Sequence, residues 1–420
     1  MGAEWRLGEE SELRLQQARA GEPVTVMLTG GSAEVLGCEL PPGRKVHLTG
    51  ESSAVFTYHG CTLTVDGAVE RAYVNDETPM IFHLNAHAVL QRRRESALEN
   101  SSPGPRCMLA GPPDSGKSSL CSLLCNYASR SGSVPLRVDL DPSLNEVASP
   151  GTVAAAAADS PVGPGQEDSA SPSAPIAYGY PYSLPCEHPQ LWMHCVHRIA
   201  KAAQAREDES ALSGASGIIV DTPPCSEECC SVQQLAEAAR ALSINTILVL
   251  GDDALRNDLE QEFKKASSVE VVEVPKSGGA LRRSIEARKR EQAKRLKHYF
   301  YGSDGSLTPS TRMLSIDDLT TLRIGGTKTA PQDTLPANVA ARADPLHVQS
   351  SEPGMDLLQH LLVIPHTQEE ESVASAACAG LVHVTQIDTS ARAITLLCPG
   401  HEALPSRFGV VGSLRWVSGE

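Results

Sequence analysis

The chain of 420 residues lacks the sequence features of membrane-spanning and exported proteins. Its first residues, MGAEWRLGEESELRL, contain no apolar signal core, and no window approaches the roughly 20 apolar residues that a spanning helix needs. Gly2 does not begin a myristoylation signal, because Arg6 stands where that signal has Ser or Thr. The sequence therefore predicts a soluble, intracellular protein.

Metal-ligand spacing and an excess of positive charge are also missing. The densest cysteine cluster, CSEECC at 225–230, has neither a second Cys-x-x-Cys nor a His pair within plausible reach, so we expect the twelve cysteines to be free or buried thiols of a reducing compartment. Only 36 Lys and Arg oppose 51 Asp and Glu, which gives a net charge of -15. This balance excludes a surface that grips nucleic acid everywhere, so any such contact must be local.

The length and the changing pattern of apolar residues predict three domains, at 1–100, 101–302 and 303–420. Up to about residue 95, short apolar runs such as VTVML, KVHL and MIFHL alternate with turn residues, which is typical of a small all-β domain, such as a sandwich. LNAHAVLQRRRESALEN then predicts a helix that SSPGPR ends. After residue 303, β-like segments such as GLVHVTQIDTSARAITLLCPG return, which indicates a third, small and β-rich α/β domain.

The central region alternates apolar strands with helices. CMLAG, LRVDLD, GIIVDT, TILVLG and VEVVEV are strand candidates of this kind, so the sequence predicts a parallel, doubly wound α/β sheet. The Ala-, Ser- and Pro-rich stretch 154–175 is predicted to be a mobile insertion in this domain. The stretch 281–298, LRRSIEARKREQAKRLKH, predicts a strongly basic helix.

A phosphate-binding loop follows the first central strand. Gly111-x-x-x-x-Gly116-Lys117-Ser118 lies between an apolar strand and a helix, the context in which this motif holds a nucleoside triphosphate. The glycines let backbone N–H groups approach the β-phosphate at a helix N-terminus. Lys117 can bridge the β- and γ-phosphates, and the Ser118 hydroxyl can reach Mg²⁺. The cofactor-binding candidates of this loop are Gly111, Pro112, Pro113, Asp114, Ser115, Gly116, Lys117, Ser118 and Ser119.

Acidic residues end two further strands. Asp139 and Asp141 in VDLDPS have the two side chains that phosphoryl transfer requires, one to hold Mg²⁺ and one to accept a proton, although either carboxylate could simply cap the next turn. Asp221 in VDTPP is a further candidate for organising magnesium. In the basic helix, Arg283 and Arg288 are either part of a solvated face or lid arginines that neutralise a transferring phosphate.

In this order, the motifs resemble those of the Clp-one family, polynucleotide kinase relatives within the pre-mRNA cleavage and polyadenylation machinery. The resemblance covers nearly the whole chain and is carried by AEVLGCEL, VFTYHGCTLTVDG, YVNDETPMIFHLNAH, GPPDSGKSS, VDLD, SPGTVAA, VPKSGGALRRS, HYFYG, AGLVHVTQID and LPSRF. It implies an N-terminal β-sandwich that helps to hold adenine, a central P-loop domain and a small C-terminal α/β domain. It also implies a nuclear location.

The resemblance implies roles for individual residues. Lys117 and Ser118 match the family's phosphate and magnesium residues, Asp141 matches the acid that activates the RNA hydroxyl, and Glu12 falls at the acidic adenine contact. Arg283 and Arg288 match the lid arginines. With Asp139 as a second metal candidate beside Ser118, the catalytic set is Lys117, Asp141, Arg283 and Arg288.

The sequence departs from active family members at three places. They carry Gly-Gln shortly after the catalytic Asp, where this chain has DPSLN, and a base-stacking Trp where it has Cys225. An adenine-contacting Lys is missing near Ser52. Two functions therefore stay open: an ATP- and Mg²⁺-dependent kinase of RNA 5′-hydroxyls, and an inactive, ATP-bound assembly subunit that docks a Pcf-type scaffold among other cleavage and polyadenylation factors.

Overall fold

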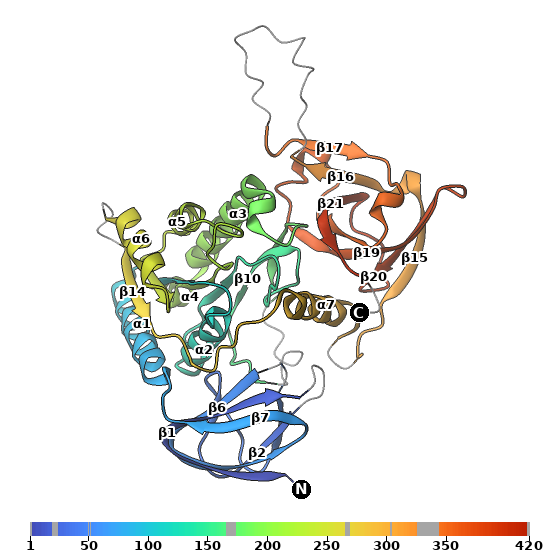
Figure 1. Cartoon of the computed structure of the whole chain (residues 1–420). Helices are drawn as coiled ribbons and strands as arrows, with labels where there is room; N and C mark the ends of the chain where they lie inside the picture. The colour runs from blue at the N-terminus through green and yellow to red at the C-terminus, as the bar shows by residue number, and fades with distance from the viewer. Residues whose placement is uncertain are drawn as a thin grey trace.

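Three seven-stranded sheets follow one another along the part of the chain that the computed structural model describes, residues 2–18, 24–48, 50, 52–164, 174–264, 269–302, 305–325 and 344–417. In Figure 1 the first sheet lies below the central one, and the third lies beside the upper part of the central region. The predicted α/β class and the order of all-β, α/β and β-rich regions are confirmed. No helix in the described residues is long and apolar enough to cross a membrane.

The first sheet is antiparallel and is built around two long strands, β1 (Ala3–Gln17) and β6 (Ser52–Asp66), which pair along most of their length. The other strands are β2 (Val24–Gly31), β3 (Glu34–Val35), β4 (Cys38–Glu39), β5 (Lys45–Leu48) and β7 (Val69–Asn75). Alternating residues such as Leu13, Leu15 and Leu63 fill its core. The run MIFHL is not part of this sheet, because it forms the first turns of helix α1 (Met80–Asn100), where Met80 and His83 are buried on one helical face.

The central sheet has the strand order β11-β10-β9-β12-β8-β13-β14. Its five predicted strands are parallel as expected, namely β8 (Arg106–Ala110), β9 (Leu136–Asp139), β12 (Ile218–Asp221), β13 (Thr246–Leu250) and β14 (Glu270–Val274). The order reverses at β8, since the chain passes from β8 to β9 on one side and later adds β13 on the other. The crevice at the carboxyl end of β8 is therefore the expected ligand site.

Helices cover both faces of this sheet (Figure 1). Apolar side chains of α2 (Lys117–Arg130) and α1 pack on one face. The other face packs against α3 (Pro189–Glu209), α5 (Val232–Ala241) and α6 (Asp253–Phe263). The remaining helices are α4 (Ala211–Ser216) and α7 (Ile285–Tyr301), the predicted basic helix.

Two antiparallel strands extend the sheet and correct one prediction. The proposed mobile insertion at 154–175 begins inside β10 (Thr152–Ala157), which pairs with β9 and with β11 (Ile176–Gly179). The alanines of β10 are buried or nearly so, and Ala155 shares a core with Leu191 and Trp192 of α3, so this Ala-rich stretch is a strand inside the sheet rather than a loop. Residues 165–173 of the predicted insertion lie outside the described residues.

The third sheet joins the central region through a shared core. Its strands are β15 (Ser310–Ser315), β16 (Thr320–Ile324), β17 (Val348–Ser351), β18 (His360–Pro365), β19 (Cys378–Asp388), β20 (Ala393–Cys398) and β21 (Phe408–Arg415). Between them the structure describes short 3₁₀ helices. Phe300 of α7 stacks on Trp416, with ring centroids 5.3 Å apart and planes 5° from parallel. The end of α7 is thus anchored in the third sheet.

The cysteines agree with the expectation of free thiols. All twelve are unpaired, and most are buried. Within the described residues no group of three or more His, Cys, Asp or Glu is arranged to hold a metal ion by protein ligands alone.

Candidate active site

The phosphate loop connects β8 to α2 at the strand-order reversal. Gly116 lies at the N-cap of α2 with φ of 96°, a conformation that glycine adopts without strain. At Gly111 a Cβ would stand 3.1 Å from the carbonyl oxygen of Leu250, so the close approach of β13 also requires glycine. The loop therefore has the backbone form that a phosphate cradle needs. Ser115 is buried within it, whereas Ser119 is exposed on α2.

Lys117 folds back into this loop. Its Nζ donates hydrogen bonds to the carbonyl oxygens of Gly111, at 3.0 Å, and Pro112, at 2.9 Å. Burial lowers the pKa of Lys117, while the carboxylates of Asp221 and Asp141 act in the opposite direction. The ammonium thus lies between the loop and the acidic strand ends.

Asp139 and Asp141 both lie at the end of β9 but differ in their partners. Asp139 is buried, and its two oxygens accept hydrogen bonds from the backbone N–H groups of Asp141, at 3.0 Å, and Glu146, at 2.7 Å. Burial and the neighbouring carboxylates of Asp221 and Asp141 raise the pKa of Asp139 well above its usual range. Asp141 is partly exposed, and its Oδ1 accepts bonds from the N–H and hydroxyl of Ser143, at 2.9 and 2.6 Å. Asp139 therefore holds the loop that follows β9, whereas Asp141 is partly exposed and close enough to Lys117 to act on its charge.

Asp221 lies beside Asp139 in the parallel register of β12 and β9. It is 2% exposed, and its Oδ1 has no hydrogen-bond partner. Burial raises the pKa of Asp221 to about 6, against the hydrogen bond with Ser118 and the charge of Lys117. A buried carboxylate oxygen without a protein partner, next to the hydroxyl of the phosphate loop, has the chemistry of a cation ligand.

Arg283 and Arg288, the arginines expected to form a lid, contact the phosphate loop at Asp114. Arg283 Nε lies 2.8 Å from Asp114 Oδ1, and Arg288 lies 2.6 Å from Oδ2, which also accepts the Arg283 N–H at 2.9 Å. Burial alone would raise the pKa of Asp114, but the hydrogen bonds from Arg283 and Arg288 hold it below its usual value. The basic helix is therefore not a wholly solvated face, since its first residues close over the loop. Sequence reasoning placed Asp114 in the loop but missed this pairing, which joins positions 169 and 174 residues apart.

Helix α7 also holds the loop that follows Asp141. Gln292 donates to the carbonyl oxygen of Ser143 at 3.0 Å, and Arg295 lies 2.9 Å from Glu146. Glu146 also accepts a bond from Arg137 of β9, at 2.5 Å. No sequence motif marked Gln292 or Glu146, because their partners come from distant segments.

A Glu146→Gln variant is expected to be less stable than the wild type at pH 7, by roughly 1.5–3 kcal/mol, because two guanidinium groups lose their anionic partner. Burial alone would raise the pKa of Glu146, but Arg295 and Arg137 lower it from 4.5 to about 2. The stabilising contribution is therefore complete above pH 4.5 and is lost as the pH falls through about 2.

Urea unfolding at several pH values measures this effect. The wild type should lose stability between pH 4.5 and 2 more steeply than the variant does. Glu237→Gln, an exposed change on α5, is the control and should follow the wild type. Identical slopes for wild type and Glu146→Gln would show that Glu146 has no such role.

Glu12 lies in β1 of the first sheet. It is close to the start of the segment 278–288, whose other end carries Arg283 and Arg288. It is buried, accepts a hydrogen bond from Arg14, and accepts a second from Thr78 at 2.8 Å. The backbone at Gly278 and Gly279 passes so close to Arg14 that a Cβ would stand about 3 Å from its guanidinium. Residues 278–288 thus run from the neighbourhood of Glu12 to the phosphate loop.

Cys225 occupies the position at which the resemblance implies an aromatic residue. Its backbone N–H donates to the carbonyl oxygen of Gly111 at 3.0 Å, so this residue does lie beside the phosphate loop. Burial raises the pKa of the Cys225 thiol to about 11, so the side chain is neutral. Neither its shape nor its charge substitutes for a stacking ring.

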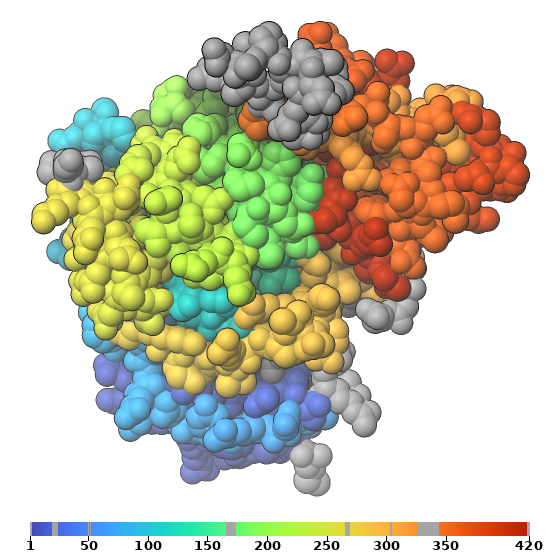
Figure 2. Space-filling view, turned by 45° about the horizontal axis from the view of Figure 1, so that its top comes forward, coloured from blue at the N-terminus to red at the C-terminus, as the bar shows by residue number. Residues whose placement is uncertain are grey.

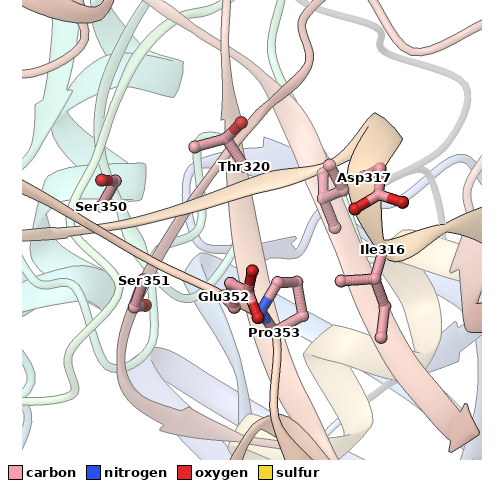
Figure 3. Close-up of a pocket in the computed structure, with 8 residues that line it drawn as sticks. Ile316, Asp317, Thr320, Ser350, Ser351, Glu352 and Pro353 are labelled. Carbon is pink, nitrogen blue, oxygen red and sulfur yellow. The ribbon is translucent and has the colours of Figure 1, made fainter. Parts of the chain in front are cut away.

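A separate cavity of about 330 Å³ lies in the third sheet, away from these residues. Figure 3 shows Ile316 and Asp317 on one side of it and Ser350 and Ser351 on the other. The Asp317 carboxylate is 2.7 Å from Arg392 and is therefore already paired. The acidic strand ends and the phosphate loop remain the better candidate for catalysis.

Comparisons with known proteins match the whole length of the chain. Family models match at residues 6–97 (N-terminal beta-sandwich domain of polyadenylation factor), 111–302 (mRNA cleavage and polyadenylation factor CLP1 P-loop) and 307–418 (Pre-mRNA cleavage complex II protein Clp1). The Protein CLP1 homolog of Arabidopsis thaliana is 34% identical over 98% of this chain and 94% of its own length. The Polyribonucleotide 5'-hydroxyl-kinase Clp1 of Xenopus laevis is 34% identical over 98% of this chain and 93% of its own.

A solved structure confirms the fold. The Clp1p chain in the structure of the wild-type Clp1p-Pcf11p (454-563) complex superposes with a TM-score of 0.84 at 19% identity, covering 99% of this chain and 98% of its own. The predicted P-loop domain flanked by an N-terminal β-sandwich is thereby confirmed as the architecture of this chain.

Proposed function

This chain belongs to the Clp1 family, and from that premise we propose that it is an ATP-dependent RNA 5′-hydroxyl kinase of the nuclear mRNA 3′-end cleavage and polyadenylation machinery. One observation carries the proposal: Lys117, Asp141 and the two lid arginines converge on the phosphate loop, and a purely structural nucleotide site has little use for a base and a lid. We propose functional domains at 1–100, 101–302 and 303–420.

The proposed transfer uses these residues in sequence. Lys117 holds the β- and γ-phosphates, and Asp141 accepts the proton of the RNA 5′-hydroxyl as that oxygen bonds to the γ-phosphorus and the bond to the β-phosphate oxygen breaks. The Ser143 hydrogen bonds to one oxygen of Asp141 hold the carboxylate in place. Arg283 and Arg288 leave their ion pairs with Asp114 and instead neutralise the negative charge on the phosphate group being transferred.

We propose that Ser118 and Asp221 hold the Mg²⁺ that accompanies ATP. Mg²⁺ takes one or two carboxylates and completes its shell with phosphate oxygens and water, which agrees with the partnerless Oδ1 of Asp221. When bound, it neutralises charge on the β- and γ-phosphates. Asp139 serves better as a support, because both of its oxygens already accept backbone bonds. Glu12 is proposed to contact adenine.

A Lys117→Ala variant is expected to bind ATP about 10- to 100-fold more weakly, because a charged hydrogen bond contributes about 1.5–3 kcal/mol. Calorimetric titration with ATP and Mg²⁺ measures this loss. Lys201→Ala removes an exposed lysine of α3 and should leave the affinity unchanged. Full affinity in the Lys117 variant would contradict the assignment of the loop.

The departure at Cys225 favours the second candidate function, an ATP-bound assembly subunit that docks a Pcf11-type scaffold, as in the complex of its structural relative. Purified protein, γ-labelled ATP, Mg²⁺ and short RNA with a free 5′-hydroxyl separate the two. Label on the RNA supports the kinase. Stoichiometric ATP that survives purification, with no label transferred, supports the assembly subunit.

A further inference from the structure

One face of α7 takes no part in the site described above. Lys289, Arg290, Lys294 and Lys297 are exposed, and Arg290, Lys294 and Lys297 recur at the spacing that places them in one stripe along the helix. None of these four forms an ion pair with another described residue. Arg283, Arg288 and Arg295, in contrast, are each paired with a carboxylate. We name these four residues the α7 stripe.

The helix that carries the α7 stripe also contacts the proposed acceptor site. On its other side the same helix contacts the phosphate loop through Arg288 and the loop after Asp141 through Gln292. In Figure 2 the segment that ends in α7 is a gold band at the surface, between the blue first sheet and the green central region, with teal residues of the phosphate-loop region visible behind it. Arg290 to Lys297 rise about 10 Å along the helix.

The charge of the stripe contrasts with the rest of the molecule. The whole chain carries a net charge of -15, so four exposed cations on one helix are a local exception. One carboxylate, Glu286, shares the exposed face at the first turn of the helix. A nucleic-acid strand carries one phosphate per nucleotide. The α7 stripe therefore complements it better than other surfaces of this acidic protein do.

We propose that the α7 stripe binds the phosphate backbone of single-stranded RNA, on the 3′ side of the nucleotide whose 5′-hydroxyl lies at Asp141. This inference rests on the proposed function, and it specifies where the remainder of the RNA substrate binds. It also accounts for Cys225: phosphate contacts supply sequence-independent affinity that a stacking ring would otherwise give. An acidic peptide would fit the charges as well, but the helix that carries them also contacts the acceptor site, which favours RNA.

Salt-dependent RNA binding tests the proposal. The variant K289Q/R290Q/K294Q/K297Q is compared with wild type by fluorescence anisotropy, with a 3′-labelled RNA of about ten nucleotides and a 5′-hydroxyl, over a range of KCl concentrations. Each lost phosphate contact lowers the slope of log affinity against log salt by about 0.7, so the slope should fall by about 2–3. The control K201Q/K264Q removes two exposed lysines away from α7, one on α3 and one at the C-cap of α6, and should retain the wild-type slope.

Phosphate transfer to RNAs of two lengths provides the second readout. A dinucleotide reaches Asp141 without crossing the stripe, so its kcat should be the same in wild type and variant and reports that the variant is folded. For the longer RNA, the KM should rise about 10-fold or more in the variant, with kcat unchanged. The charge-conserving K289R/K294R/K297R should restore the low KM.

Each outcome decides between the alternatives. An unchanged salt slope, or an equal loss in K201Q/K264Q, overturns the inference and leaves the proposed kinase untouched. Loss of binding to polyglutamate, with RNA binding unchanged, assigns the stripe to a protein partner and overturns it as well. RNA that binds through the stripe but is never labelled supports the inference and overturns only the proposed chemistry.

Discussion

An Asp141→Asn variant is expected to transfer phosphate to RNA about 10²- to 10⁴-fold more slowly than the wild type, the usual contribution of a general base, while it binds ATP equally well. Asparagine keeps the size of the side chain and can still accept the Ser143 hydrogen bonds. It cannot take the proton of the attacking hydroxyl. The loss should therefore fall on kcat and not on ATP affinity.

Single-turnover transfer of labelled phosphate to a 5′-hydroxyl RNA measures this rate, and calorimetry measures ATP binding. Asp159→Asn changes an exposed carboxylate of the same domain and is the matched control. A wild-type rate in Asp141→Asn would remove Asp141 from the mechanism. A loss of ATP binding equal to the loss of rate would instead make it a structural residue of the nucleotide site.

The second large effect is expected from the lid. Arg288→Gln should lower kcat by about 10³- to 10⁵-fold if Arg288 neutralises the transferring group as an arginine finger does. Its present partner, Asp114, shows that the guanidinium reaches the loop. The change removes one of the two cations that hold that carboxylate, so ATP affinity is measured separately.

Arg282→Gln is the control for this variant, because it removes an exposed arginine from the same segment. Transfer should be reduced in Arg288→Gln and retained in Arg282→Gln. Equal rates in the two would show that the lid arginine only packs against Asp114. The alternative function as an assembly subunit would then gain support.

Local patterns predicted the parts of this protein that depend on neighbouring residues. Gly111 to Ser118 specify a strand, a tight loop and a helix in direct succession, so the phosphate loop could be placed from sequence alone. The five apolar runs of the central sheet were equally clear, because four of these parallel strands are buried along nearly their whole length and only the edge strand β14 is partly exposed.

Features that depend on distant partners were harder to predict. Nothing near Ala155 indicates that α3 will cover it, so an Ala-rich strand resembled a loop. Asp139 and Asp221 look alike in sequence, and only the backbone donors of Asp141 and Glu146 distinguish the saturated carboxylate from the one with a free oxygen. The pairing of Asp114 with Arg283 and Arg288 required the fold as well.

The stacking of Phe300 on Trp416 has a consequence for the order in which the protein matures during synthesis. Trp416 leaves the ribosome 116 residues after Phe300, and it directly follows β21, which lies inside the third sheet between β18 and β16. Until Trp416 has been synthesised, Phe300 at the end of α7 lacks the Trp416 ring against which it stacks. The phosphate loop and Asp141 are synthesised much earlier. The nascent chain therefore makes its nucleotide cradle well before the ring that secures the end of α7, and the proposed kinase can have its anchored lid only after β21 and Trp416 have been synthesised.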